Sequence, residues 1–324
     1  MVLARDIKDS VVVITGASGG IGAATALALA RRGASLVLAA RRRNALEEVA
    51  TRCRDAGGDA VVVPTDVRNL DEVERLGERA ITTYGHLDAW VNNAAVACYA
   101  PFGEAMAEFR NTVETNLLGV AHGTAVALRH LTDGGVIVTV GSILSAVTVP
   151  YLSSYNASKH AVQGLTDSVR QEITERGEGR ISICSVLPAS VDTPLYANAA
   201  NYTGRRLRPP PPVYSPELVA ERIVRVIERP RAHAYPGSAA RAAVLAWRLL
   251  PALSRRLAAR VADRMMFAPG TAAPTSGNVL GPTPEPSRIR GGWHGVARPL
   301  VAPAVAATRL ARRAGMFGAR MGHG

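Results

Sequence analysis

The sequence predicts an α/β fold in which helices cover both faces of a doubly wound, parallel sheet of about seven strands. Over the first two-thirds of the 324 residues, short apolar runs alternate with amphipathic stretches of helical length. The apolar runs are nearly continuous, as expected of strands whose two faces are both buried. A glycine-rich turn, Gly16 to Gly22, joins the first apolar run to the first helix, an arrangement that suits a dinucleotide pyrophosphate.

The elements are expected in regular alternation. Strands are predicted at residues 10–15, 34–40, 59–67, 87–95, 134–142 and 179–188, with 232–237 as a seventh. Helices are predicted at residues 20–33, 43–58, 69–84, 106–130 and 153–176. Gly33 is a stop signal for the first helix. A later helix, 215–230, has Ser215 as its N-cap and Pro216 at its first helical position.

The alternation ends after Pro188, and the rest of the chain differs in composition. Residues 197–215 are polar, basic and rich in proline, which predicts a mobile loop or lid. Residues 239–267 read as an arginine-studded amphipathic helix interrupted at Pro251. Residues 268–324 are rich in Pro, Gly, Thr and Ser as far as about 292, which predicts a disordered tail that carries a short basic segment.

The net charge of +12 is unevenly distributed along the chain. Residues 1–200 contain 18 basic and 21 acidic residues, whereas residues 201–324 contain 20 basic and 5 acidic residues. This asymmetry suggests an anionic surface as a partner of the C-terminal part: a membrane, an acidic protein or a nucleic acid. Aromatic residues make up only 5% and no recognition motif is present, so nucleic acid is disfavoured.

The remaining composition indicates a cytoplasmic protein. No apolar run reaches the length of a membrane span, and the N-terminus has no secretory signal pattern. The three cysteines have neither paired nor metal-type spacing, so they are expected to be buried and reduced, and no metal site is expected.

Residues 16–20 also match G-x-S-x-G, the nucleophile elbow of serine hydrolases, with Ser18 as the nucleophile. In that class the motif follows several strands, whereas Gly16 follows the first strand here. None of the seven histidines stands in a conspicuous strand-end loop after a matching acid. We therefore favour the dinucleotide interpretation, in which Ser18 contacts phosphate or forms the turn.

The end of the second predicted strand indicates which dinucleotide binds. An acid that would select NAD(H) is expected near Ala40, but the sequence there continues with Arg41, Arg42 and Arg43. A guanidinium can bind a ribose 2′-phosphate through two parallel hydrogen bonds. NADP(H) is therefore preferred, with NAD(H) as the alternative.

Tyr155 and Lys159 stand four residues apart at the start of a predicted helix and so share one face. A tyrosine has an ordinary pKa of about 10 and is a poor base near neutral pH. A neighbouring ammonium stabilises the phenolate, and we expect Lys159 to lower the pKa of Tyr155 in this way. The chain has 38 basic residues but only two lysines, so a lysine at this position supports the interpretation.

Taken together, these motifs resemble the classical short-chain dehydrogenase/reductase (SDR) family over about residues 8–240. The stretches that carry this resemblance are TGASGGIG (15–22), Asp66 in TDV, NNAA (92–95), Asn116 in ETNLLG, Ser142 in VGSI, YNASK (155–159) and PASVDT (188–193). Two glycines of the family pattern are replaced, by Ala95 and Ala189. Both changes touch the loops around the cofactor and leave the reacting groups in place.

The resemblance implies a Rossmann-type catalytic domain over residues 1–238, followed by the helical extension and the tail. It implies a catalytic tetrad of Asn116, Ser142, Tyr155 and Lys159, with Asn116 positioning a water that relays protons to the lysine. The cofactor residues that it implies are Gly16, Ser18, Gly20, Ile21, Gly22, Arg41, Arg42, Asp66, Val67, Asn93, Ala94, Tyr155, Lys159, Pro188, Val191 and Thr193. A homodimer or homotetramer is also implied.

By the same resemblance, the substrate pocket is expected to be mostly apolar. Its expected residues are Ser142, Ile143, Leu144, Val149, Tyr151, Ala189, Leu195 and Tyr196. Such a pocket favours a lipophilic carbonyl or alcohol, interconverted by hydride transfer. The alternative is a non-catalytic NADP(H) sensor of the same fold that acts through the basic tail. The extension itself is expected to pack on the enzyme or a sister subunit, or to lie peripherally on an anionic membrane.

Overall fold

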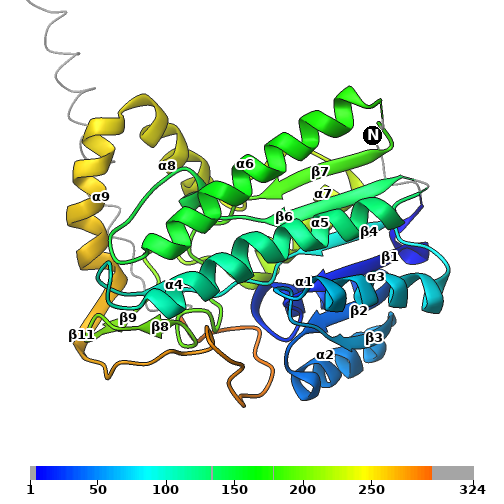
Figure 1. Ribbon diagram of the computed structural model, residues 1–324, viewed down its shortest axis with the longest axis horizontal. Helices are drawn as coiled ribbons and strands as arrows, with labels where there is room; N and C mark the ends of the chain where they lie inside the picture. The colour runs from blue at the N-terminus through cyan, green and yellow to red at the C-terminus, as the bar shows by residue number, and fades with distance from the viewer. Residues whose placement is uncertain (1–4, 133, 178, 294–324) are drawn as a thin grey trace, which may run out of the picture.

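The computed structural model describes residues 5–132, 134–177 and 179–293, and it contains the parallel sheet that the sequence predicts (Figure 1). Seven strands lie in the order β10-β7-β6-β4-β1-β2-β3, and every neighbouring pair is parallel. Their bounds are β1 Val11–Thr15, β2 Ser35–Ala40, β3 Asp59–Pro64, β4 Ala89–Asn92, β6 Gly135–Val140, β7 Ile181–Val186 and β10 His233–Ala234. The predicted fold class is confirmed.

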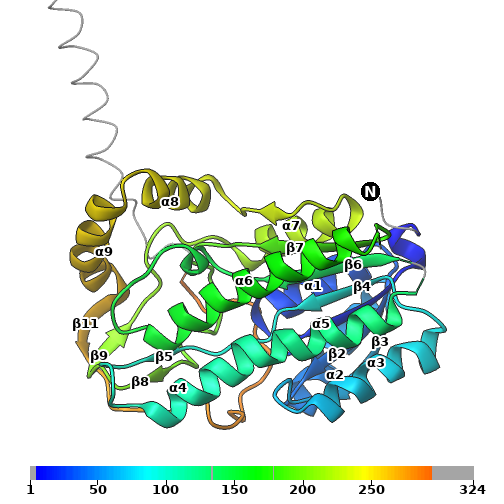
Figure 2. The ribbon, with the colours of Figure 1, turned by 45° about the horizontal axis from the view of Figure 1, so that its top comes forward.

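Helices cover both faces of this sheet and bury two apolar clusters (Figure 2). One cluster joins the sheet to α1 (Gly20–Ala30), α2 (Arg43–Asp55) and α7 (Pro216–Glu228). The other joins it to α3 (Leu70–Tyr84), α5 (Gly119–His130) and α6 (Ser153–Glu175). Because both faces are covered, the strands are buried almost throughout, which explains their continuous apolar runs.

The sheet order changes direction next to β1, and this determines where a ligand can bind. From β1 the chain builds outward through β2 and β3, then crosses to place β4 on the other side of β1. Ligands of open α/β sheets bind at such a switch point, beyond the carboxyl ends of the strands. The loops that follow β1 and β4, at Gly16 and Asn93, meet there: the Asn93 amide donates to the Thr15 carbonyl at 2.9 Å.

The long helix predicted over residues 106–130 is divided by a π-helical turn. It comprises α4 (Met106–Val113), the π turn Glu114–Leu118 and α5. A π turn inside an α-helix is rare and often accompanies a functional residue. Asn116 lies within this turn.

Two segments that composition predicted to be mobile or disordered are instead built into the fold. Within residues 197–215, β8 (Ala200–Asn201) pairs with β5 (Cys98–Tyr99), and β9 (Arg205–Leu207) pairs with β11 (Phe267–Thr271). Residues 268–293 continue from β11 across the protein, and Val279 is fully buried there. The prediction of disorder was wrong for 268–293 because main-chain pairing anchors this segment; residues 294–324 lie outside the described part.

The predicted helical extension forms α8 (Ser238–Leu249) and α9 (Pro251–Met266), which break at Pro251 as expected. Ala240, Val244 and Met266 are buried against the enzyme, whereas Leu245, Leu249 and Leu250 are exposed.

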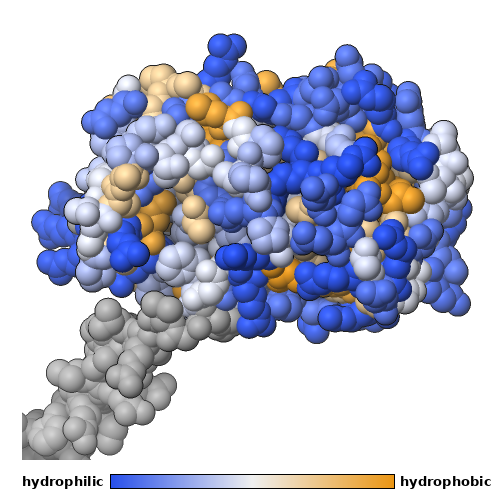
Figure 3. Space-filling view, turned by 90° about the horizontal axis from the view of Figure 1, so that it is seen from below, coloured by the Kyte–Doolittle hydropathy of each residue, from blue (hydrophilic) through white to orange (hydrophobic). Residues whose placement is uncertain are grey.

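The face in Figure 3 is mostly hydrophilic, with hydrophobic side chains in small separate patches. Among the described residues, no helix is both long and apolar enough to span a membrane. The three cysteines are buried and unpaired, as predicted.

Candidate active site

One cavity of about 560 Å³ extends along the carboxyl ends of the strands. Residues from the loop after β1, the ends of β2 and β3, and the loop after β4 line one half of it. Residues from the loop after β6, the start of α6 and the α9–β11 junction line the other half. The cavity thus joins the glycine-rich turn at one end to Ser142 and Tyr155 at the other.

The glycine turn brings main chain into close contact at the switch point. Gly16 and Gly20 have φ values of +66° and +54°, which glycine adopts without strain. A Cβ on Gly22 would lie 2.4 Å from the Gly16 carbonyl oxygen, so glycine is required there for helix α1 to approach the turn. Gly16, Ser18, Gly20 and Ile21 line the cavity, but Gly22 does not and only packs behind them. The N-terminus of α1 therefore faces the cavity, and a helix N-terminus favours an anion.

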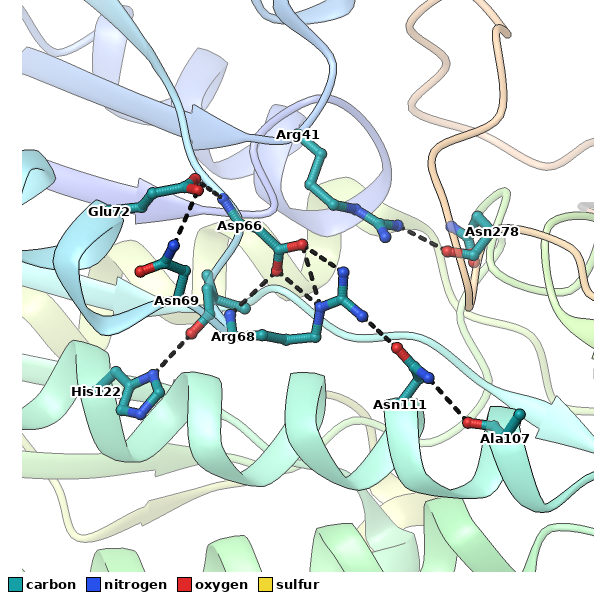
Figure 4. A network of polar contacts seen from close by, with 10 residues as sticks. Arg41, Asp66, Arg68, Asn69, Glu72, Ala107, Asn111, His122 and Asn278 are labelled. Carbon is teal, nitrogen blue, oxygen red and sulfur yellow. Dashed lines mark hydrogen bonds and ion pairs between the residues drawn. The ribbon is translucent and has the colours of Figure 1, made fainter.

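The ends of β2 and β3 carry several of the charged groups that line the cavity (Figure 4). Arg41 and Arg42 both line it, and the Arg42 guanidinium lies 3.4 Å from the Ser18 hydroxyl. Burial lowers the pKa of Arg41, while the nearby Asp66 carboxylate acts in the opposite direction. The guanidinium nevertheless stays charged, because arginine is effectively always protonated.

Asp66 also lines the cavity, but its carboxylate is held by Arg68. The Arg68 Nη2 atom donates to Asp66 Oδ2 at 2.6 Å, and a further nitrogen of Arg68 donates to the Asn111 amide (Figure 4). Burial would raise the pKa of Asp66, but the Arg68 hydrogen bonds outweigh it and the pKa lies below its ordinary value. Sequence reasoning missed Arg68, although a basic residue two positions after the acid was a usable signal.

Ser142, Tyr155 and Lys159 meet in the other half of the cavity. Ser142 caps the short turn Ile143–Ser145 by accepting a hydrogen bond from the Leu144 amide at 3.1 Å, which fixes its hydroxyl beside the pocket. The neighbouring Ser142 hydroxyl acts on the Tyr155 phenol in the direction that lowers the pKa of this phenol. Lys159 is buried and donates to the Val140 carbonyl at 3.0 Å, and its Nζ lies 5.5 Å from the centre of the Tyr155 ring.

The pKa values here differ from the sequence expectation. Burial and the neighbouring Tyr196 raise the pKa of Tyr155 well above its ordinary value, and the opposing effect of Ser142 offsets only part of this rise. Burial also lowers the pKa of Lys159 to about 8. The expected lowering of the Tyr155 pKa by Lys159 is therefore not found, because desolvation is the largest effect on both groups.

Asn116 does not line the cavity, in contrast to the other three members of the expected tetrad. It is fully buried, and its amide pairs with both main-chain groups of Val96, at 2.9 Å and 3.0 Å. The same amide donates to the Ser158 hydroxyl at 3.1 Å. Asn116 thus connects a cavity-lining loop to helix α6 directly beside Lys159. A polar side chain at such a depth is retained for the contacts it makes.

The remaining residues that were expected at the site line the cavity, with one exception. Val67, Asn93, Ala94, Pro188, Val191 and Thr193 line the cavity, as do Ile143, Leu144, Val149, Ala189, Leu195 and Tyr196. Tyr151 does not: it has a φ of +64° and its ring packs edge-on against Phe267 at 5.8 Å, outside the cavity. Its placement in the pocket was wrong because the strained turn rotates it outward. Tyr99, Met265 and Met266 also line the pocket, although they were not predicted from the sequence.

Comparison with known proteins identifies this arrangement. The sequence model of the family described as short chain dehydrogenase matches residues 10–202. The chain belongs to the short-chain dehydrogenase/reductase family. It is accordingly an oxidoreductase that acts on alcohol or carbonyl groups with a nicotinamide cofactor. Among the described residues, no group of three or more His, Cys, Asp or Glu side chains could hold a metal ion.

Two relatives illustrate the similarity in sequence. The uncharacterized oxidoreductase YxnA of Bacillus subtilis is 36% identical over 265 residues, which cover 79% of this chain and 73% of that protein. The cis-4-hydroxycyclohexanecarboxylate dehydrogenase of Sinomonas cyclohexanicum is 44% identical over 193 residues, which cover 58% of this chain and 76% of that protein.

Two solved structures illustrate the similarity in fold. An SDR from Burkholderia phymatum in complex with NAD has a TM-score of 0.68 at 28% identity, and the match covers 77% of this chain and 96% of that one. A short-chain dehydrogenase from Burkholderia cenocepacia in complex with NADP has a TM-score of 0.66 at 28% identity, covering 78% and 99%.

Proposed function

We propose that the protein uses NADP(H) to interconvert a carbonyl and an alcohol on a lipophilic small molecule, with Tyr155 as the acid and base. One observation carries this proposal: a single cavity has Arg41, Arg42 and the glycine turn at one end and Ser142, Tyr155 and Lys159 at the other. The phosphate-binding groups and the proton-transfer groups therefore face the same molecule.

The residues present fit a phosphorylated dinucleotide. The N-terminus of α1 and Ser18 would hold the pyrophosphate, and Arg41 and Arg42 the ribose 2′-phosphate. Val67, Asn93 and Ala94 would line the adenosine, and Pro188, Val191 and Thr193 the nicotinamide side. The buried ammonium of Lys159 donates one hydrogen bond to the Val140 carbonyl and has further N–H donors for a ribose hydroxyl. A reduced nicotinamide, when bound, supplies the hydride that the carbonyl carbon accepts.

The side chains of this chain supply the proton and the charge stabilisation. Ser142 donates a hydrogen bond to the carbonyl oxygen and orients it next to Tyr155. Tyr155 transfers its phenolic proton to that oxygen as negative charge develops, giving the alcohol. Lys159 stabilises the phenolate that remains. Asn116 acts as a positioning residue, because it joins the Val96 loop to α6 beside Lys159.

The walls of the pocket support a lipophilic substrate. Leu144, Val149, Leu195 and Met266 surround the space next to Tyr155. Among the residues that the structure describes, Lys159 is the one charged side chain that lines this half. The dehydrogenase of Sinomonas cyclohexanicum is named for a cyclic hydroxy acid, which is consistent with an alicyclic alcohol or ketone. We place the enzyme in the cytoplasm and expect a homodimer or homotetramer.

The proposal is tested with purified protein and a panel of alicyclic and steroid-like ketones, following the nicotinamide absorbance. Tyr155→Phe should lower turnover by about 10²- to 10⁴-fold and leave NADPH binding intact. The matched control is Tyr235→Phe, because Tyr235 lies outside the cavity. Turnover by Tyr155→Phe at the wild-type rate would refute the acid–base role.

The same material tests the cofactor. Arg41→Ala should weaken NADPH binding by roughly 10- to 100-fold, since a hydrogen bond to a charged group contributes about 1.5–3 kcal/mol, and should change NADH binding little. Arg43→Ala is the control, because Arg43 carries the same charge but does not line the cavity. Equal losses for NADPH and NADH would contradict the 2′-phosphate assignment.

A further inference from the structure

The C-terminal segment 272–293, which we call the strap, returns from β11 toward the N-terminus of α1 (Figure 1). Its first half is anchored beside β8. The Asn278 amide donates to the Asn198 carbonyl at 2.8 Å, and Thr275 and Asn201 exchange main-chain hydrogen bonds. Val279 is fully buried in an apolar cluster with Cys98 and Ala200.

The second half of the strap is anchored at the loop after β7. The amides of Gly291 and Trp293 both donate to Asp192 Oδ1, at 3.0 Å and 2.7 Å. The Trp293 ring packs edge-on against Tyr196 at 6.3 Å, and Ile289 packs on the core cluster under α1. Because both ends are fixed, residues 280–288 span the cavity between them.

Between its anchors the strap contacts the groups that we assign to the cofactor phosphates. The Asn278 carbonyl accepts from Arg41 Nη2 at 2.7 Å, and the Glu285 carbonyl accepts from Arg42. The Arg288 carbonyl accepts from the Gly20 amide at 2.9 Å, at the N-terminus of α1. Three main-chain carbonyls of one segment thus hold both guanidiniums and an amide of the glycine turn.

The strap is also a wall of the cavity. Asn278, Pro282, Thr283, Glu285, Pro286 and Arg288 line it together with Gly16, Arg41 and Asp66. The cavity therefore lies between the glycine turn and the strap.

We propose that the strap is part of the cofactor site: its carbonyls position Arg41 and Arg42 for the 2′-phosphate, and the dinucleotide enters and leaves only when the strap lifts. This inference rests on the proposed binding of a dinucleotide in the cavity. Each guanidinium has five N–H donors and uses only a few of them on the strap, so donors remain for phosphate. The contacts that position the guanidiniums come from main-chain carbonyls, which carry no net charge.

Gly291 offers a way to loosen the strap at one anchor. A Cβ at this position would lie 2.3 Å from the Thr193 carbonyl oxygen and 2.6 Å from the Trp293 ring nitrogen, so Gly291→Ala must displace the strap locally. Gly281→Ala is the matched control in the same segment, because a Cβ there meets nothing within 4 Å and Gly281 does not line the cavity. Val279→Ala is a second, milder variant that shrinks the buried anchor at the other end.

The experiment measures association and dissociation rates of NADPH and NADH by stopped-flow fluorescence in the full-length wild type and the three variants. Gly291→Ala should raise both the association and the dissociation rate of either dinucleotide at least about fivefold, the effect expected of one unfavourable core contact. Val279→Ala should raise both rates less, and Gly281→Ala should match the wild type. The ratio of NADPH to NADH affinity should fall in Gly291→Ala, since the arginines lose their positioning contacts.

Each outcome has a definite meaning. Rates in Gly291→Ala and Val279→Ala equal to wild type would overturn the requirement for opening, and an unchanged affinity ratio would overturn the positioning role. If Gly291→Ala fails to fold, Val279→Ala decides on both points. Wild-type protein that binds neither dinucleotide would overturn the proposed function, and this inference with it. Preference for NADH would overturn only the assignment of NADP(H) and of the 2′-phosphate, because the NADH rates still report on the strap.

Discussion

Replacing Lys159 should make the protein more stable at neutral pH while removing its activity. Lys159 is only 2% exposed, and burial lowers its pKa from the ordinary 10.5 to about 8. The folded state therefore binds the proton on this lysine less tightly than the unfolded state does. Each unit of that difference corresponds to about 1.36 kcal/mol of free energy of unfolding.

The sign and the pH range follow from this shift. Below pH 8 the lysine is charged in both states and the full penalty on folding applies, about 3 kcal/mol. Between pH 8 and 10.5 the folded lysine loses its proton first, so the free energy of unfolding rises with pH. At pH 9.5 a penalty of roughly 1 kcal/mol remains.

The assay is urea unfolding of wild type and Lys159→Met at pH 7 and pH 9.5. The stability advantage of the variant should be about 2 kcal/mol larger at pH 7 than at pH 9.5. Packing changes and the lost hydrogen bond to Val140 cancel in that comparison, since they do not depend on pH. Lys8→Met is the control, because the Lys8 side chain is 67% exposed. A difference that is the same at both pH values would refute the reasoning.

Two further predictions concern packing and the C-terminal helices. Gly22→Ala should lower the free energy of unfolding by about 1–3 kcal/mol and abolish dinucleotide binding, because its Cβ would lie 2.4 Å from the Gly16 carbonyl. The control in the same urea titration is Gly164→Ala, because a Cβ there meets nothing within 4 Å. Equal stabilities of the two variants would contradict the packing argument. The full-length protein should sediment with anionic vesicles at low salt and less at physiological salt. Leu249→Glu should weaken this binding whereas Leu70→Glu should not, since Leu249 is 68% exposed within the basic C-terminal part. No sedimentation at low salt would exclude a membrane-bound extension.

The sheet and the two ends of the cavity could be predicted because they depend on local patterns. Seven strands follow apolar runs, and the turn at Gly16 and the pair Tyr155 and Lys159 follow from spacing alone. Tyr151 was misplaced because its direction depends on a φ of +64° that no spacing encodes. The pKa of Tyr155 was misjudged because desolvation depends on the whole wall around it.

The strap illustrates a deeper limit of composition. Its proline, glycine and threonine content is typical of disorder, yet its order comes from main-chain groups that every residue has. The carbonyls of Asn278, Glu285 and Arg288 make the decisive contacts, so the identities of those side chains carry no signal. The apolar pair Val279 and Leu280 was a usable signal of a buried point, and of these two residues only Val279 is buried.

The π turn at Glu114–Leu118 has a consequence for how the helix before and after it packs. A π turn contains one residue more than an α turn, and one residue corresponds to about 100° of rotation around the helix axis. Helix α4 contacts α6, whereas α5 contacts α3 and β4. The extra residue rotates the apolar stripe of α5 relative to that of α4 around the helix axis. The two halves of one continuous helix can therefore pack against neighbours that lie on different sides of it. Deleting a single residue from the turn would restore a regular helix, and the apolar stripe of either α4 or α5 would then point away from the elements on which it packs.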